Sequence, residues 1–307
     1  MSLFRTIFRQ TVPIAIALFV PDVAMAESKP KLPSVQAVAE RTVSESLTAN
    51  QKIGVSLLDG EVMLTEDGSR LPALEAVAER AISEDLTANM VIGVLLPDGE
   101  TVWIREGTLA FESDREADEH SLYRAYSLTK PVTSLAAILL IIDGVIALDQ
   151  PISDFIPAFA DMQVLIDPDS YGETRSAARE ITIRHLLTHT SGLGYSTIPS
   201  GLSETYARAG IVPGLRLPHP LAPIYGEEPG SLRAFAEKVA ELPLRVDPGT
   251  EWHYSIGQDV LAAVIETAAD QSFESFVQAR IFAPLSMDDT GFVVAPEDLS
   301  RLTTNYA

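Results

Sequence analysis

The sequence predicts an α+β fold in which an antiparallel β-hairpin precedes a mostly helical region. Residues 91–96 and 101–104 are short apolar runs on either side of an Asp-Gly turn, the pattern of a hairpin. Further along, residues 231–242 and 258–269 repeat apolar side chains at helical spacing. Strands and helices are therefore separated along the chain, as in α+β proteins, and do not alternate as in α/β proteins.

The composition limits what the chain can bind. Its 307 residues are 46% hydrophobic, enough to bury the core of one large domain or of two modest ones. The net charge of -21 argues against nucleic acid and anionic membrane surfaces as partners, because both repel an acidic protein. The chain has no cysteine, which excludes disulfides, thiolate catalysis and cysteine-type zinc sites.

Residues 1–26 have the pattern of an export signal peptide. Arg5 and Arg9 form a positive region, residues 12–20 are apolar, and residues 24–26 (Ala-Met-Ala) match a small-x-small cleavage site. A membrane anchor is the less favoured alternative, because the apolar run is too short to span a bilayer. The sequence therefore predicts a periplasmic or secreted bacterial protein with no stable membrane span after cleavage.

An internal repeat follows. Residues 33–61 align without gaps with residues 72–100, and 19 of the 29 aligned positions are identical. Two copies are too few for a solenoid, so a local duplication of one helix-strand unit is the simpler interpretation. Since only the second copy continues into the rest of the chain, residues 72–307 are predicted as the main domain and residues 27–71 as a partial duplicate of its first unit.

Ser127 and Lys130 are the first candidate catalytic residues. They lie three positions apart at the start of an apolar segment, and on a helix this spacing brings the amine within reach of the hydroxyl. Residues 135–142 are apolar all round, which predicts a buried core helix. A lysine at the edge of a core loses water, and a helix N-terminus favours negative charge on the serine oxygen. Both conditions activate a serine nucleophile.

Several competing patterns carry less weight. The Ser-x-x-Lys spacing is weak alone, because Ser28 and Lys31 share it in a proline-broken stretch. His185 and His189 are one helical turn apart, but Leu186 stands where a zinc protease needs glutamate, so structural histidines are favoured and no metal is predicted. The chain has no Gly-x-Ser-x-Gly elbow and no nucleotide-binding loop, and no cofactor is predicted.

Tyr254 is the third candidate. It follows a Pro-Gly turn and Trp252 and directly precedes a predicted helix, so a loop presents it beside packed structure. Alone, such a tyrosine is more often a core residue with its hydroxyl hydrogen-bonded. Beside a lysine, however, its phenolate is stabilised and can take the proton of Ser127.

Four motifs occur in an order that resembles a known superfamily. They are Ser127-Leu-Thr-Lys130, Leu186-Leu-Thr-His-Thr-Ser-Gly-Leu193, Pro248-Gly-x-x-Trp-x-Tyr254-Ser255 and Pro284-Leu-Ser-Met287-Asp-Asp-Thr290-Gly-Phe292. Together they resemble the serine β-lactamase and penicillin-binding-protein-like superfamily, and within it the class C β-lactamases and the carboxylesterases of that fold. The resemblance runs from about residue 72 to the last residue.

The resemblance implies a β-lactamase/transpeptidase-like fold, with an antiparallel sheet flanked by helices and a mostly helical subdomain. It also implies an acyl-enzyme mechanism in which Ser127 is the nucleophile and Lys130 and Tyr254 share the general-base role, with the proton going to either. The backbone N–H of Ser127 would supply half of the oxyanion hole. The implied partner is a small-molecule ester or amide substrate.

Two departures from the family pattern sharpen this expectation. Relatives that act on β-lactams or peptides usually carry asparagine two residues after the tyrosine, and Ile256 stands there instead. A site without that polar partner discriminates poorly for amides. This favours a carboxylesterase of small or moderately lipophilic esters over the alternative, a β-lactamase or D-Ala-D-Ala carboxypeptidase. In addition, no Lys/His-Thr/Ser-Gly or Trp-Gly-Gly motif follows Tyr254, which predicts a C-terminally incomplete family member.

Incompleteness has two consequences that the sequence leaves open. A sheet without its last strands has an unpaired edge, and residues 53–58, the duplicated strand, are expected to pair there. The alternative to an active enzyme is an inactive fragment or a binding module that has inherited Ser127 without a catalytic role. The natural substrate and the oligomeric state do not follow from the sequence.

Overall fold

The protein divides into two compact units. Unit 1 comprises Met1–Ala125 with Phe282–Ala307, and unit 2 comprises Tyr126–Ile281. The computed structural model describes residues 50–56, 71–96, 99–212 and 229–306. The predicted signal peptide, residues 1–26, and most of the predicted duplicate, residues 27–71, lie outside this part of the chain.

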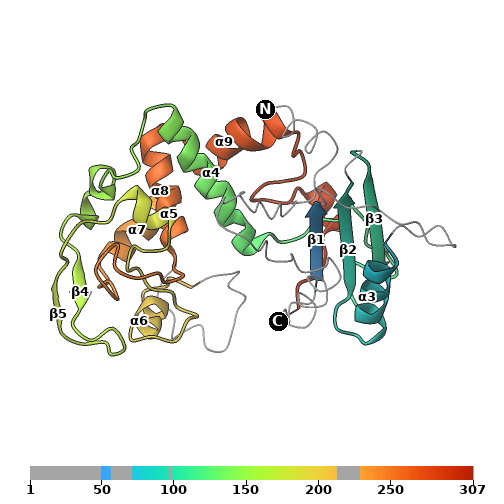
Figure 1. Ribbon diagram of the computed structural model, residues 1–307, viewed down its shortest axis with the longest axis horizontal. Coiled ribbons are helices and arrows are strands. Elements are labelled where there is room, and N and C mark those ends of the chain that lie inside the picture. Colours follow the sequence, from blue (N-terminus) through green and yellow to red (C-terminus); the bar gives the residue numbers. More distant parts are fainter. Residues whose placement is uncertain (1–49, 57–70, 97–98, 213–228, 307) are drawn as a thin grey trace, which may run out of the picture. The chain divides into compact units, whose positions relative to one another are not determined.

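Unit 1 contains a three-stranded sheet in the order β1-β2-β3 (Figure 1). β2 (Asn89–Leu95) and β3 (Thr101–Gly107) form the antiparallel hairpin predicted from the sequence, with Ile92 opposite Ile104. β1 (Asn50–Ser56) pairs with β2 in parallel, so this sheet is mixed and not purely antiparallel.

The register between β1 and β2 follows the sequence repeat. Asn50 pairs with Asn89 and Ile53 with Ile92, so each residue of β1 lies opposite its own counterpart in the second copy. In the described part of the chain, β1 covers the edge of β2 that faces away from β3, where backbone groups would otherwise be unpaired. The duplicated strand therefore pairs along the hairpin.

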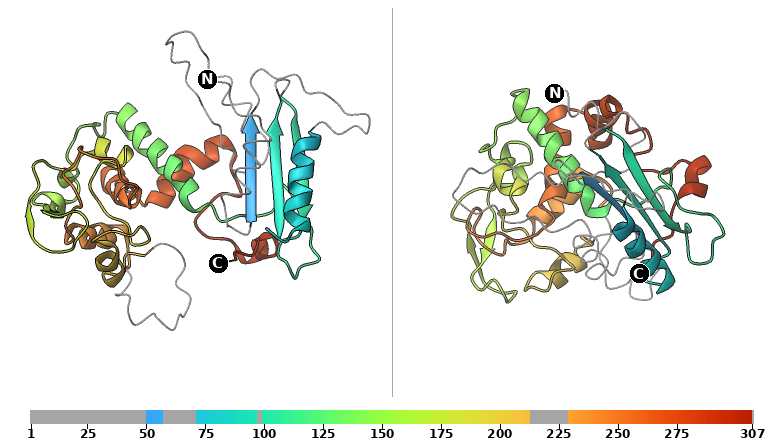
Figure 2. Two further views of the ribbon diagram at one scale, coloured as in Figure 1. Left: turned by 60° about the horizontal axis from the view of Figure 1, so that its bottom comes forward. Right: turned by 45° about the vertical axis from the view of Figure 1, so that its right-hand side comes forward.

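α3 (Pro72–Ser83) covers one side of this sheet, packed against β2 and β3 (Figures 1 and 2). Proline at the first helical position is favourable, because the backbone N–H that it lacks has no partner within the helix. The buried residues follow the spacing i, i+3, i+4, i+7 of one helix face: Leu74, Val77, Ala78 and Ala81. With Met90, Ile92, Val94 and Ile104 of the strands, they form the apolar core of unit 1.

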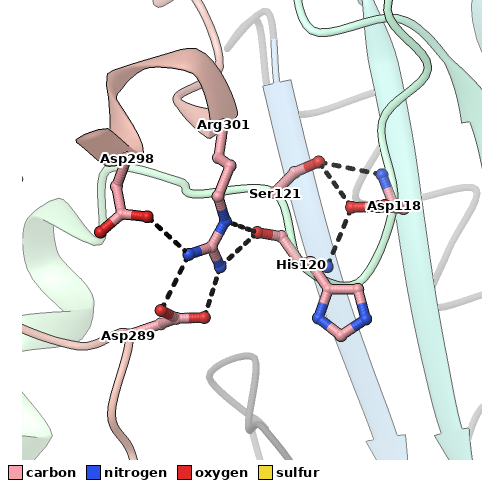
Figure 3. Close-up of polar contacts among 6 residues, drawn as sticks. All are labelled: Asp118, His120, Ser121, Asp289, Asp298 and Arg301. Carbon is pink, nitrogen blue, oxygen red and sulfur yellow. Dashed lines mark hydrogen bonds and ion pairs between the residues drawn. The ribbon is translucent and has the colours of Figure 1, made fainter. Parts of the chain in front are cut away.

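The C-terminal segment of unit 1 is tied to the loop that follows β3 by Arg301 (Figure 3). Its guanidinium donates to the backbone oxygen of His120 from Nε at 2.9 Å and from Nη2 at 2.7 Å. The same group forms ion pairs with the carboxylates of Asp289 and Asp298. The backbone of Leu122 adds a hydrogen bond to the oxygen of Arg301, at 2.8 Å. Segments about 180 residues apart in sequence are thereby joined.

Unit 2 is mostly helical and is organised around α8 (Gly257–Ala269). Four helices pack against α8: α4 (Thr129–Ile142), α5 (Ile183–Leu187), α7 (Leu232–Ala240) and α9 (Phe273–Val277) (Figure 1). Residues 260–265 of α8 are all buried, which confirms the helix predicted over residues 258–269. Ser231 caps α7 by accepting a hydrogen bond from the backbone of Ala234, which confirms the predicted start of that helix.

α4 is less buried than the sequence predicts. One face is buried, through Thr133, Ala136, Ala137 and Leu140. The other side exposes Leu135, Ile138 and Ile142. The prediction of a helix buried all round was therefore wrong: small alanines let one side approach α8 and α9, and apolar composition alone does not bring a partner to the other side.

Two further stretches of unit 2, which lack the periodicity of a strand or helix in the sequence, contain short regular elements. β4 (Gln163–Leu165) and β5 (Thr174–Ser176) form a second, two-stranded antiparallel sheet within residues 161–180. α6 (Ser203–Arg208) lies within residues 194–229. Strands of three residues carry too little periodicity to be predicted from sequence.

Several short helical turns complete the described secondary structure. They are 3-10 turns at Tyr126–Leu128, Ile152–Asp154, Pro157–Phe159, Ala283–Leu285 and Pro296–Arg301, and a π-helical turn at Gln278–Phe282. Within the described ranges, no helix combines the length and apolar character needed to cross a membrane.

Candidate active site

Ser127 lies where the chain enters α4. It belongs to the 3-10 turn Tyr126–Leu128, which runs directly into Thr129, so the serine stands at the N-terminal end of a 14-residue helix. Tyr126, the residue before it, has a φ of +42°, a left-handed conformation that is uncommon for residues other than glycine. Such strained residues concentrate at functional sites. Ser127 itself is exposed and accessible to a substrate.

The three candidate side chains converge in unit 2. Lys130 Nζ donates to Ser127 Oγ at 3.2 Å, as the spacing on one helix face predicts. Tyr254 OH donates to the same oxygen at 2.8 Å, from a loop 127 residues further along the chain. Lys130 Nζ also lies 4.7 Å from the centroid of the Tyr254 ring, within the range of a cation–π contact. The structure therefore brings one hydroxyl, one amine and one phenol into mutual contact.

The loop that carries Tyr254 is held by the segment after α5. The backbone N–H of His253 donates to the backbone oxygen of His189 at 2.8 Å. At the start of the loop, Gly249 has a φ of +82°, and a Cβ there would lie 2.9 Å from Nε2 of His185. Glycine is required by both the conformation and the close approach. The position of Tyr254 thus depends on contacts between distant parts of the sequence.

Ile256 ends this loop and precedes α8. Its side chain is 5% exposed and offers no hydrogen-bond donor or acceptor. This is the position at which the family resemblance implies asparagine in relatives that act on β-lactams or peptides. In the structure, the residue there belongs to the apolar core.

Aromatic rings surround Tyr254. The imidazole of His189 stacks on its ring, with centroids 4.9 Å apart and planes inclined by 25°. Tyr195 lies 5.7 Å away at a tilt of 52°. Trp252 meets the His189 ring edge-on at 6.0 Å and is 64% exposed. Trp252 therefore exposes an apolar surface next to His189.

The two histidines of the His-x-x-x-His pattern have different environments. His185 belongs to a capping box at the start of α5, in which its Nδ1 accepts from the backbone of Thr182 at 3.1 Å. Burial lowers the pKa of His185, and the charge of Arg179 lowers it further. This histidine is structural, as the sequence analysis favoured.

His189 contacts the candidate catalytic residues. Burial lowers the pKa of its imidazole, and the positive charge of Lys130 lowers it further, so the ring is neutral at neutral pH. Its φ is +54°. His189 was predicted only as a structural histidine, although its motif, Leu186-Leu-Thr-His-Thr-Ser-Gly-Leu193, was one of the four that carried the resemblance. Within the residues that the structure covers, no cluster of three or more His, Asp or Glu side chains is placed to bind a metal.

Comparison with known proteins assigns the family. The sequence profile described as β-lactamase matches residues 78–307, well over half of the chain. The chain belongs to the β-lactamase family. The resemblance inferred from the four motifs is thereby confirmed.

Within the β-lactamase family, the chain is similar to esterases. It is 36% identical over 190 residues to esterase EstB of Burkholderia gladioli, covering 62% of this chain and 43% of the esterase. Lovastatin esterase of Penicillium rubens is 30% identical over 194 residues, covering 62% of this chain and 44% of that esterase. The matched region is a little under half of each relative.

Solved structures confirm the α+β, β-lactamase/transpeptidase-like fold. EstCE1, described as a hydrolase with promiscuous acyltransferase activity, superposes with a TM-score of 0.60 at 27% identity, covering 75% of this chain and 54% of that chain. Simvastatin synthase (LovD) from Aspergillus terreus gives a TM-score of 0.58 at 26% identity, covering 76% of this chain and 57% of that chain. The chain spans about half the length of these relatives.

Proposed function

We propose that this protein is a serine hydrolase that works through an acyl-enzyme and hydrolyses small or moderately lipophilic carboxylic esters. The observation that carries the proposal is the pair of hydrogen bonds on Ser127 Oγ, from Lys130 Nζ and Tyr254 OH. A serine hydroxyl is a weak nucleophile until an adjacent base takes its proton. Here two groups that can act as that base are within hydrogen-bond distance.

In the acylation step, Ser127 Oγ forms a bond to the ester carbonyl carbon while its proton passes to the oxygen of Tyr254 or the nitrogen of Lys130, whichever is unprotonated. Backbone N–H groups, that of Ser127 among them, stabilise the tetrahedral oxyanion by about 3 kcal/mol each. The C–O bond of the ester breaks, and the leaving alkoxide takes the proton from the base. Alcohol departs and the acyl group stays on Oγ.

Deacylation repeats these steps with water as the nucleophile. The base removes a proton from water as its oxygen bonds to the acyl carbon, and the Oγ–carbon bond of the second tetrahedral intermediate breaks. Ser127 recovers a proton from the base and the carboxylic acid leaves. The cycle consumes one ester and one water.

Three observations support an ester over an amide as the substrate. Ile256 supplies no hydrogen bond for an amide group. Tyr195 lies against Tyr254 and Trp252 against His189, and this aromatic surface around the tyrosine suits a lipophilic acyl or alcohol group. The similar protein EstB is named an esterase.

The test compares two substrates and one covalent probe. The wild type is expected to hydrolyse p-nitrophenyl butyrate faster than a chromogenic cephalosporin and to bind one fluorophosphonate per chain. Ser127→Ala should abolish labelling, while Ser83→Ala, a matched control at another exposed serine, should retain it. Faster turnover of the cephalosporin would overturn the ester proposal in favour of β-lactam hydrolysis. An unlabelled wild type would indicate an inactive family member.

We also propose that the protein is exported to the periplasm or beyond. The proposal rests on the charge, apolar run and cleavage pattern of residues 1–26. Expression of the full chain in a bacterium should yield a product outside the cytoplasm whose first residue is Glu27. Mass spectrometry of the fractionated protein checks this, and an uncleaved cytoplasmic product would contradict it.

A further inference from the structure

We propose that His189 is a positioning residue for Tyr254, because its ring packs on the phenol and holds the hydroxyl against Ser127. The catalytic consequence rests on the proposed function. The structural part stands on contacts within unit 2, and it can be tested without any reaction.

Stacking on His189 sets the plane of the phenol. The two centroids are 4.9 Å apart with planes 25° from parallel, within the range of favourable offset stacking. Tyr195, at 52°, meets the phenol at a steeper angle and leaves its plane less defined. The hydroxyl of Tyr254 reaches Ser127 Oγ at 2.8 Å, so a rotation of the side chain about its Cα–Cβ bond, which moves the oxygen, would break this hydrogen bond. A nearly parallel neighbour opposes such a rotation most directly.

The backbone of His189 also contacts the loop that carries Tyr254. Its φ of +54° is left-handed, which costs roughly 1 kcal/mol for a residue with a Cβ and less for asparagine or glycine. Glycine or asparagine would adopt this backbone conformation at a lower cost in free energy than histidine. Its backbone oxygen accepts from His253, the neighbour of Tyr254, at 2.8 Å. One residue therefore holds the tyrosine loop through both its backbone and its ring.

The environment of Nδ1 indicates that His189 supports Tyr254 through the face of its ring and not through a hydrogen bond of that nitrogen. Nδ1 of His189 is buried, and no group in the described ranges hydrogen-bonds to it. An unpartnered buried polar atom is unfavourable by about 1–3 kcal/mol. The neutral ring can stack beside Lys130 without repelling its ammonium, which an imidazolium would do. Phenylalanine should therefore replace histidine here with little loss, whereas a small side chain should not.

The first test measures how fast Ser127 reacts with a fluorophosphonate, a probe of nucleophilic attack alone. His189→Asn tolerates the left-handed backbone but removes the ring, and we expect a rate about 10-fold lower. His189→Phe keeps an aromatic face and should stay within about 3-fold of the wild type. Ester kinetics should show the same ranking in kcat, with KM unchanged within about 2-fold.

His185→Asn is the matched control, because it makes the same substitution one helical turn away. Its Oδ1 can accept from the backbone of Thr182 in place of His185 Nδ1, so the capping box on α5 is kept and Tm should change little. The labelling rate of its folded fraction should stay within about 2-fold of the wild type. Equal rates for His189→Asn and the wild type would overturn the proposal, as would equal losses in the two His→Asn variants or a Phe variant as slow as the Asn variant.

A second test does not need activity. In protein labelled with ¹³C-tyrosine, the ring signals of Tyr254, assigned with Tyr254→Phe, report how freely the ring flips. Flipping should be faster in His189→Asn than in the wild type and in His189→Phe. The same flip rate in all three would overturn the positioning role. Inert wild-type protein would instead overturn the proposed function, and the flip rates would still decide the role of His189.

Discussion

Arg301 in unit 1 and Lys130 in unit 2 are cationic side chains with different kinds of partner. In unit 1, the guanidinium of Arg301 pairs with the carboxylates of Asp289 and Asp298, and it also bonds the backbone oxygen of His120 in the loop after β3 (Figure 3). In unit 2, Lys130 donates to the hydroxyl of Ser127 and lies over a tyrosine ring. A cation paired with carboxylates contributes to stability, whereas a cation beside a hydroxyl can take part in proton transfer. Substitution of Lys130 and the groups it contacts should therefore affect activity most, and substitution of Arg301 should affect stability.

The largest effect is expected for Ser127→Ala. Removal of the nucleophile should lower kcat for p-nitrophenyl butyrate by at least about 10³-fold, because the acyl-enzyme cannot form. Ser127 is exposed, so Tm should be nearly unchanged. A variant that keeps substantial activity would refute the nucleophile assignment and remove the contrast between the units.

Substitution of the two candidate bases should have the next largest effect. Lys130→Met and Tyr254→Phe should each lower kcat by about 10²–10⁴-fold, since each removes a polar group bonded to Ser127 Oγ. The more damaging of the two identifies the group that takes the proton. If both variants hydrolyse the ester at the wild-type rate, proton transfer does not use either group.

Arg301→Ala should lower stability and leave the reactivity of Ser127 almost unchanged, the opposite of the substitutions above. It removes one guanidinium that bonds two carboxylates and a backbone oxygen, so the free energy of unfolding should fall by about 2 kcal/mol in denaturant titrations. The fluorophosphonate rate of the folded protein should stay within about 2-fold. Arg208→Ala is the matched control: its pair with Glu204 is 68% and 73% exposed and is worth about 0.5 kcal/mol or less. An equal loss of unfolding free energy in Arg301→Ala and Arg208→Ala would show that Arg301 contributes no more than an exposed ion pair.

The smallest effect concerns pH. Arg105 beside Glu119 lowers the pKa of that carboxyl from 4.5 to about 2. Because the folded pKa is lower than the unfolded one, the pair stabilises the protein above pH 4.5, and this contribution is lost as the pH falls from 4.5 to 2. Unfolding free energies measured across that window should fall more steeply for the wild type than for Glu119→Gln. Parallel curves would show that the pair does not contribute.

Local patterns in the sequence were enough to predict much of the fold. The hairpin of β2 and β3 and the helices α3, α7 and α8 follow from apolar periodicity and capping residues, which act over a few neighbouring positions. The three-residue strands β4 and β5 were missed, because they are too short to carry a period. The exposure of Ile138 on α4 was missed because burial depends on what packs against a helix as well as on its composition.

The sequence by itself determined the family and the Ser127–Lys130 pair, because a spacing of three on one helix places the two groups together whatever surrounds them. Only the tertiary structure decided that Tyr254 donates to the same serine and that His189, and not His185, stacks on its ring. These contacts join loops far apart along the chain. Their geometry is set by packing, by left-handed residues and by backbone hydrogen bonds between segments, which no local pattern specifies.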